Sequence, residues 1–227
     1  MLCLFDLDGT LIDSEPGITA CIRYAFDKLG VPAPADLRPW IGPPLRRGFA
    51  SLLDHDAGRV EAAVDFYHER FATLGWREHA VYPGIAAAID RLRQAGHALA
   101  VVTSKPVRHA APIIEALPFG GAFGKLYGPD PSSAHCEKAT MIAAALADFG
   151  APPHEAAMIG DRRFDIEGAL ANRVRGIGVL WGFGSREELE LAGAQALAQD
   201  PGHLADLLAG TATHSVGAHP VRDDSDV

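Results

Sequence analysis

Two aspartates that follow a short apolar run near the start of the chain place the strongest constraint on its fold. Residues 2–5 are apolar and predict a buried strand, and Gly9 ends that run. Side chains two positions apart on a strand point to the same side, so Asp6 and Asp8 are expected to project together. Ligands of open α/β sheets bind at the carboxyl ends of the strands. Two such close carboxylates predict a divalent cation, catalysis, or both.

The composition limits the classes of function. The chain has 227 residues and a formal net charge of −9, which disfavours nucleic acid or an anionic membrane as the main partner. We expect a cytoplasmic protein, because neither a secretory leader pattern nor a membrane-spanning apolar run is seen. The three scattered cysteines show no metal-binding spacing and are expected to be buried and reduced: Cys3, Cys21 and Cys136.

A helical insert is expected directly after the first strand. Apolar residues recur at helical spacing over residues 18–29 and 60–74. A rigid loop at residues 40–45 leads into a further helix through Leu53. The pattern predicts no strand between residues 14 and 81, and therefore a small helical bundle.

Beyond the insert, strands alternate with helices, which predicts a doubly wound parallel α/β sheet. Strands are expected at residues 98–102, 123–127, 156–159 and 176–180, with an edge strand near 194–197. Helices are expected over residues 85–95, 138–149, 185–192 and 202–209. Two more are expected to end at about residue 117 and at about residue 171. The expected division is a core of residues 1–13 and 82–210, a helical cap of 14–81 and a flexible tail of 211–227.

Polar residues stand at the tips of three of these expected strands, and parallel strands bring their carboxyl ends to one edge. Thr103 and Ser104 follow one strand, Asp161 and Asp165 follow another, and Lys138 opens the intervening helix. Carboxylates, a lysine and a hydroxyl suit a Mg²⁺-bound phosphoryl group, because Mg²⁺ takes oxygen ligands while the lysine and hydroxyl hold phosphoryl oxygens.

Each of these groups has a simpler explanation when taken alone. An Asp-Gly-Thr sequence is usually a turn or a helix start, and Lys138 alone fits a solvated charge. Thr103 fits a strand cap, and Asp161 and Asp165 fit an N-cap and an exposed helical acid. Those explanations would have to hold together at the tips of successive apolar strands, which favours one shared site.

With these residues in view, the chain resembles the haloacid dehalogenase-like (HAD) hydrolase superfamily. The resemblance covers residues 1 to about 210 in order, spacing and strand placement, and implies a Rossmann-like core with a helical cap in the C1 position. The four motifs are DLDGTL at 6–11, Thr103-Ser104, Lys138 and GDRRFD at 160–165.

The resemblance implies a role for each motif residue. Asp6 is implied to be the nucleophile that forms an aspartyl-phosphate, and Asp8 the general acid and then the base. Mg²⁺ is implied on the Asp6 carboxylate, the Asp8 main-chain carbonyl and Asp161, with Asp165 completing or supporting that shell. The implied phosphate ligands are Thr103, Lys138 and the main-chain N–H groups of Leu7, Asp8 and Ser104.

Three further groups are left with two interpretations each. Lys138 is preferred over Lys105 as the third-motif lysine because it opens a helix after a glycine- and proline-bearing loop; Lys105 is expected to contact substrate or to start its own helix. In the cap, the loop with Gly42 and Pro43 can lie over the site, and Arg46 or Arg47 can meet a substrate carboxylate or second phosphate, although a surface arginine explains each equally well. Arg162 and Arg163 fit a salt bridge or a catalytic part.

The leading functional hypothesis is a Mg²⁺-dependent phosphatase for a small phosphorylated metabolite, acting as a monomer or homodimer. Residues 13–14, 41–45, 82–84 and 103–106 are similar to phosphoglycolate phosphatase-like proteins, a group whose members also include 5′-nucleotidases and pyrophosphatases. Asp8 favours phosphate esters over the chemistry of dehalogenases or phosphonatases, but a β-phosphoglucomutase-like sugar phosphomutase would use the same acid. The helical insert and the complete motif set disfavour a phospho-acceptor switch and an inactive binding protein.

Overall fold

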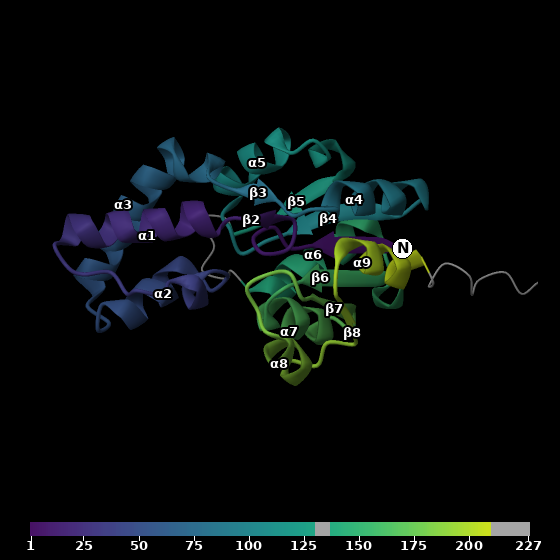
Figure 1. Cartoon of the computed structure of the whole chain (residues 1–227). Coiled ribbons are helices and arrows are strands. Elements are labelled where there is room, and N and C mark those ends of the chain that lie inside the picture. Colours follow the sequence, from purple (N-terminus) through teal and green to yellow (C-terminus); the bar gives the residue numbers. More distant parts are fainter. Residues whose placement is uncertain (130–136, 210–227) are drawn as a thin grey trace, which may run out of the picture.

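The computed structural model describes residues 1–129 and 137–209, and six parallel strands form its main sheet in the order β5-β4-β1-β6-β7-β8 (Figure 1). This confirms the predicted doubly wound α/β fold. β1 lies between β4 and β6, so its carboxyl end is at the point where the strand order reverses, where such sheets bind ligands. The strands are β1 Leu2–Phe5, β4 Ala98–Val102, β5 Lys125–Tyr127, β6 Ala156–Gly160, β7 Arg175–Val179 and β8 Ala196–Ala198.

Helices cover both faces of the sheet, because alternate residues of the buried strands supply two separate apolar surfaces. Cys3 and Phe5 of β1 belong to one apolar cluster, and Leu2 and Leu4 belong to the other. The first face is covered by α4 Ile85–Gln94, α5 Val107–Ala116 and α9 Pro201–Ala209. The second is covered by α6 Lys138–Phe149 and α7 Arg163–Ala171, and the short α8 Arg186–Leu191 follows β7.

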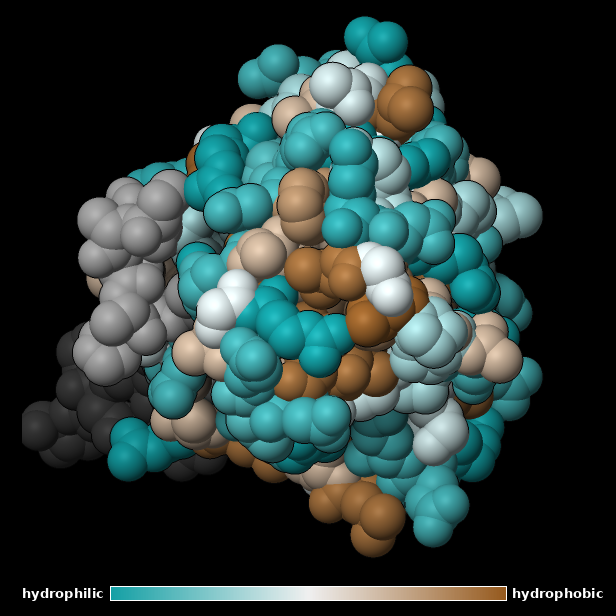
Figure 2. All heavy atoms as spheres, turned by 90° about the vertical axis from the view of Figure 1, so that its left-hand side faces the viewer, coloured by the Kyte–Doolittle hydropathy of each residue, from teal (hydrophilic) through white to brown (hydrophobic). Residues whose placement is uncertain are grey.

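The segment after β1 forms the predicted helical insert, which lies to the left of the sheet in Figure 1. Figure 2 shows this end of the molecule, where hydrophobic side chains gather near the middle of a mostly hydrophilic face. Helices α1 and α2 both pack against α3. The helices are α1 Glu15–Leu29, α2 Leu45–Leu52 and α3 Ala57–Thr73, with 3₁₀ turns at Arg38–Trp40 and Gly75–Arg77.

The expectation of no strand between residues 14 and 81 is wrong. β3, Ala80–Val81, pairs antiparallel with β2, Ile12–Asp13, so the two connections to the helical insert lie side by side. Two-residue strands are too short to show the alternation by which a strand is predicted, which is why the pattern missed them.

Two other expectations lie partly or wholly outside the described residues. Cys3 and Cys21 are buried and free, as predicted, whereas Cys136 and the tail of residues 211–227 are not among the described residues. Among the described helices, none combines the length and the apolar character that a membrane span requires.

Truncating Leu4, which is fully buried at the centre of β1, should destabilise the fold. Leu4→Ala is expected to lower the free energy of unfolding by about 2–5 kcal/mol, because it leaves a cavity between the sheet and α6. Leu191→Ala, at a leucine that is 82% exposed, is the matched control and should change it by less than about 0.5 kcal/mol. Urea unfolding measures both values, and equal effects would contradict the assigned core.

Candidate active site

Three buried carboxylates meet at the carboxyl edge of the sheet. Asp6 follows β1, Asp161 follows β6, and Asp165 lies in the first turn of α7. One oxygen from each lies within 4.8 Å of the others. Burial, reinforced by the Asp165 charge, raises the pKa of Asp6 to about 7 even though Lys138 opposes the shift. Burial and the Asp6 and Asp165 charges also raise the pKa of Asp161, so the ionised cluster is under strong electrostatic repulsion.

Lys138, the first residue of α6, partly offsets this repulsion from within the cluster. Its ammonium nitrogen lies 2.9 Å from Asp6 Oδ1 and 2.7 Å from Asp165 Oδ1, and it donates to the Val102 carbonyl at 3.0 Å. Burial alone would lower the pKa of Lys138, but the Asp165 and Asp6 carboxylates raise it above its ordinary value. The lysine therefore remains protonated and fixes the orientation of both carboxylates.

The cluster fits a hard divalent cation such as Mg²⁺. Its donors are all carboxylate oxygens, which Mg²⁺ prefers, and the Lys138 ammonium pairs with two of its three acids. Asp8 Oδ1, beside the cluster, is also buried without a hydrogen bond. A cation would balance the remaining negative charge of the cluster.

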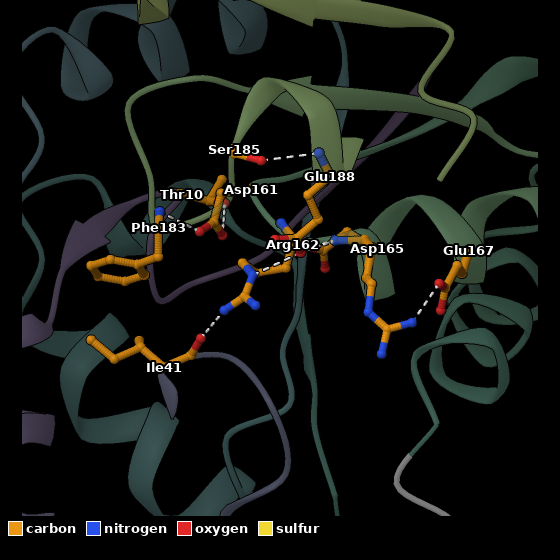
Figure 3. A network of polar contacts seen from close by, with 10 residues as sticks. Thr10, Ile41, Asp161, Arg162, Asp165, Glu167, Phe183, Ser185 and Glu188 are labelled. Atoms are coloured by element: carbon orange, nitrogen blue, oxygen red, sulfur yellow. Dashed lines mark hydrogen bonds and ion pairs between the residues drawn. The ribbon is translucent and has the colours of Figure 1, made fainter. Parts of the chain in front are cut away.

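The loop that follows β7 supports the three-carboxylate cluster through a hydrogen bond to Asp161. The Phe183 amide donates to Asp161 Oδ2 at 2.8 Å, and Trp181 Nε1 donates to the Thr10 carbonyl at 3.0 Å (Figure 3 shows the Phe183 contact). Gly9, at φ +83°, leaves room for the Asp161 carboxylate, since a Cβ at Gly9 would lie 2.2 Å from Asp161 Oδ2. Sequence reasoning missed this loop, although a Gly-X-Gly sequence after an expected strand was a usable signal.

Asp8 lies beside the cluster and is paired with the second candidate lysine. Lys105 Nζ is 3.1 Å from Asp8 Oδ2, and it also lies 4.6 Å from the centre of the Phe71 ring on α3. The structure thus places Lys138 at Asp6 and Lys105 at Asp8. Lys105 also bridges the sheet edge and the helical insert.

Two of the predicted phosphate ligands, Thr103 and Ser104, line the same opening, whereas Lys138 is not among its lining residues. Thr103 is buried at the end of β4, and its hydroxyl accepts a hydrogen bond from the Lys105 amide at 3.1 Å. Thr103, Ser104, Asp6 and Asp8 all line one cavity. The Leu7 side chain belongs to the core, so Leu7 can serve a ligand only through its backbone.

The cavity has a volume of about 580 Å³ and lies between the sheet edge and the helical insert. Gly42 and Pro43, which belong to the loop before α2, form part of its wall. Arg46 also lines it, but its side chain is paired with Glu61 at 2.8 Å. Arg47 is exposed and is not one of the lining residues, so the structure does not bring it to this cavity.

A histidine pair in the cavity wall was missed by sequence reasoning. His68 of α3 and His109 of α5 stack with ring centroids 4.8 Å apart, and both line the cavity. Burial lowers the pKa of His109 to about 3, with help from the nearby charges of His68 and Arg108. Burial also lowers the pKa of His68. No local pattern marks these two positions, because the contact joins helices about forty residues apart in sequence.

A parallel α/β core with a carboxylate cluster beside a ligand-sized cavity fits an enzyme active site. The family model described as haloacid dehalogenase-like hydrolase matches residues 3–179. The chain belongs to this family, as the motifs predicted.

Three relatives with named activities are similar to this chain over most of its length. The chain is 40% identical to a 5′-nucleotidase of Pseudomonas aeruginosa over 82% of this chain and 85% of that one, and 32% identical to phosphoglycolate phosphatase 1 of the same species, over 80% and 70%. It is 33% identical to the tyrosine-protein kinase PtkA of Mycobacterium tuberculosis, covering 83% of this chain but only 65% of that protein.

A solved structure, described as a predicted phosphatase from Clostridium acetobutylicum, superposes with a TM-score of 0.86 at 35% identity, over 91% of this chain and 97% of that one. The family match and the phosphatases among the relatives make the chain an enzyme of the HAD-type phosphatase class.

Neutralising Asp161 should separate stability from metal binding. Without metal, Asp161→Asn is expected to raise the melting temperature by a few degrees, since it removes one of three mutually repelling buried charges. Mg²⁺ should stabilise the wild type but not this variant, because ligand binding to the folded state alone raises stability. The exposed Asp27→Asn is the control and should keep the wild-type response. Equal responses of Asp161→Asn and wild type to Mg²⁺ would contradict the site.

Replacing His109 with Phe should reduce the loss of stability in acid. The unfolded chain binds a proton at His109 below its ordinary pKa of 6.5, while the folded chain does so only near pH 3, so this histidine costs stability as the pH falls through that window. His109→Phe keeps the ring and removes the titration. Between about pH 7.5 and 5, its melting temperature should fall a few degrees less than that of the wild type. The raised pKa of Asp6 acts in the opposite direction but in both proteins alike.

Proposed function

We propose that the chain is a Mg²⁺-dependent phosphatase that hydrolyses a small phosphorylated metabolite through an aspartyl-phosphate on Asp6. The observation that carries the proposal is the position of Asp6. Its buried carboxylate contacts Lys138 and belongs to the three-carboxylate cluster. It also lines the cavity that Asp8 and Thr103 line.

The first step is attack by the Asp6 carboxylate on phosphorus. An oxygen–phosphorus bond to Asp6 forms while the bond from phosphorus to the alcohol oxygen breaks, and protonated Asp8 donates its proton to that departing oxygen. Lys138 and Thr103, with the main-chain N–H groups of Leu7, Asp8 and Ser104, hold the other phosphoryl oxygens. Their fixed positions lower the barrier by stabilising charge where it develops.

The second step releases orthophosphate. Asp8, now ionised, takes a proton from a water molecule, whose oxygen bonds to phosphorus while the bond to Asp6 breaks. The Asp6 carboxylate and a protonated Asp8 are regenerated. Mg²⁺, held by Asp6, the Asp8 carbonyl and Asp161 with support from Asp165, would supply charge neutralisation at the carboxylates and the phosphoryl group when bound.

We propose that residues 14–81 act as a cap on a core of residues 1–13 and 82–210. The paired strands β2 and β3 at the two connections support this division, and so does the cavity between the insert and the sheet edge. A cap over the cavity would exclude water while the phosphoenzyme forms.

Phosphoglycolate is the first substrate to test, and the cavity favours nucleoside 5′-monophosphates as the second candidate. A volume of about 580 Å³ lies in the range used for drug-sized ligands, well above what a two-carbon acid fills. Aromatic side chains that suit a flat base also line it, and the relative at 40% identity is named a 5′-nucleotidase. The lining rings are those of Trp40, Tyr67, His68, Phe71 and His109.

Orthophosphate release from a phosphate-ester panel, with and without Mg²⁺, tests the proposed activity. Phosphoglycolate, nucleoside 5′-monophosphates, sugar phosphates and pyrophosphate should include at least one substrate whose hydrolysis requires Mg²⁺. An isomerised sugar phosphate without net phosphate release would instead identify a phosphomutase. Failure of the whole panel would contradict the proposal.

Asp6→Asn tests the nucleophile directly. The variant should retain the fold, because the amide keeps the size of the side chain, but turnover should fall by at least about a thousandfold, as expected when a covalent nucleophile is removed. Circular dichroism checks the fold and phosphate release checks the rate. Asp27→Asn, with the same change at an exposed site, should be fully active.

A further inference from the structure

The loop of residues 40–45, which we call the cap loop, forms one wall of the cavity. It is in contact with residues 160–165, which we call the metal motif. It connects the 3₁₀ turn at Arg38–Trp40 with α2, and its residues line the cavity opposite Asp6 and Asp8. Behind this wall lies Arg162, directly after Asp161. Arg162 itself is not among the lining residues, so it touches the cap loop without facing a ligand.

Arg162 is held at both ends (Figure 3). Its amide donates to Asp165 Oδ2 at 3.1 Å, and its Nε donates to Glu188 Oε1 of α8 at 2.9 Å. Its Nη1 donates to the Ile41 carbonyl in the cap loop. The side chain is only 13% exposed, so these contacts are shielded from solvent and are stronger than surface ion pairs.

The cap loop is shaped to accept this contact. Ile41 is fully buried, and Gly42 has φ +103°, a backbone conformation that favours glycine. A Cβ at Gly42 would lie 3.1 Å from Arg162 Cγ, so a side chain there would push the loop and the arginine apart. A second contact joins the 3₁₀ turn before the cap loop to the loop after β7. The Arg38 guanidinium lies 5.9 Å from the centre of the Phe183 ring.

We propose that Arg162 is a positioning residue that sets leaving-group selection by holding the cap loop against the metal motif. This inference rests on the proposed phosphatase function, because the leaving group of the ester would face the cap loop. A substrate whose leaving group reaches the loop depends on Arg162, whereas one with a very small leaving group does not. A merely structural arginine would affect both substrates alike.

Kinetics with two phosphate compounds of different size test the proposal. For Arg162→Gln, the KM for p-nitrophenyl phosphate should rise about tenfold with little change in kcat, the factor expected for one lost hydrogen bond to a charged group. The value of kcat/KM for acetyl phosphate should stay within about twofold. Arg163→Gln is the matched control, since the side chain of this neighbour is half-exposed and pairs with Glu167 of its own helix, and it should behave as wild type on both substrates.

Gly42→Ala is a second variant that reaches the same contact from the cap loop. It should reproduce the selective rise in KM by separating the cap loop from Arg162, while Arg162 and the acids of the cluster stay unsubstituted. Amide hydrogen exchange gives a readout that does not depend on activity: in Arg162→Gln, the amides of the non-proline residues of 40–45 should exchange at least about tenfold faster, while β1 stays protected.

The outcomes separate this inference from the proposed function. Equal losses on both substrates, or unchanged kinetics together with unchanged exchange at residues 40–45, would overturn the role of Arg162. A wild type that hydrolyses neither compound nor any member of the phosphate-ester panel would overturn the proposed function, and the exchange measurement would still decide whether Arg162 holds the cap loop.

Discussion

The contact of one buried ammonium with two buried carboxylates is the constraint on which the site depends. Lys138 lies 2.9 Å from Asp6 and 2.7 Å from Asp165, and Asp161 completes a cluster that still carries more negative than positive charge. Such a cluster is costly in a folded protein unless it is used. The parallel sheet makes this cluster geometrically possible, because β1 and β6 end, and α6 begins, at one edge of the sheet. The loop behind Asp161 then fixes the last carboxylate through the Phe183 amide.

The proposed function assigns chemistry and recognition to different parts of the molecule. The groups proposed to react lie at the sheet edge, whereas the cavity walls come largely from the helical insert. Contacts that join the two parts include Lys105 with Phe71, His109 with His68, and Arg162 with the Ile41 carbonyl. Each joins a residue close to the acids or to a motif with a residue of the insert. The placement of the insert over the acids is therefore coupled to side chains that are not themselves expected to react.

Much of the fold was predictable from local patterns. Continuous apolar runs mark the central strands, and the acid-bearing residues that end them converge because parallel strands share a direction. The family and the enzyme class followed from motif order and are confirmed. The strands β2 and β3 are too short to show a period. The contacts of His68 and Arg162 join distant segments, so no window of the sequence reveals them. The roles of individual acids remain predictions.

The most direct test of the central claim is a crystal structure of the protein with Mg²⁺ and beryllium trifluoride, a mimic of a phosphoryl group bound to a carboxylate. We expect beryllium bonded to an Asp6 oxygen, with Lys138 and Thr103 around its fluorines and Mg²⁺ shared by Asp6 and Asp161. Beryllium on Asp8, or Mg²⁺ bound away from the Asp6–Asp161 pair, would contradict it.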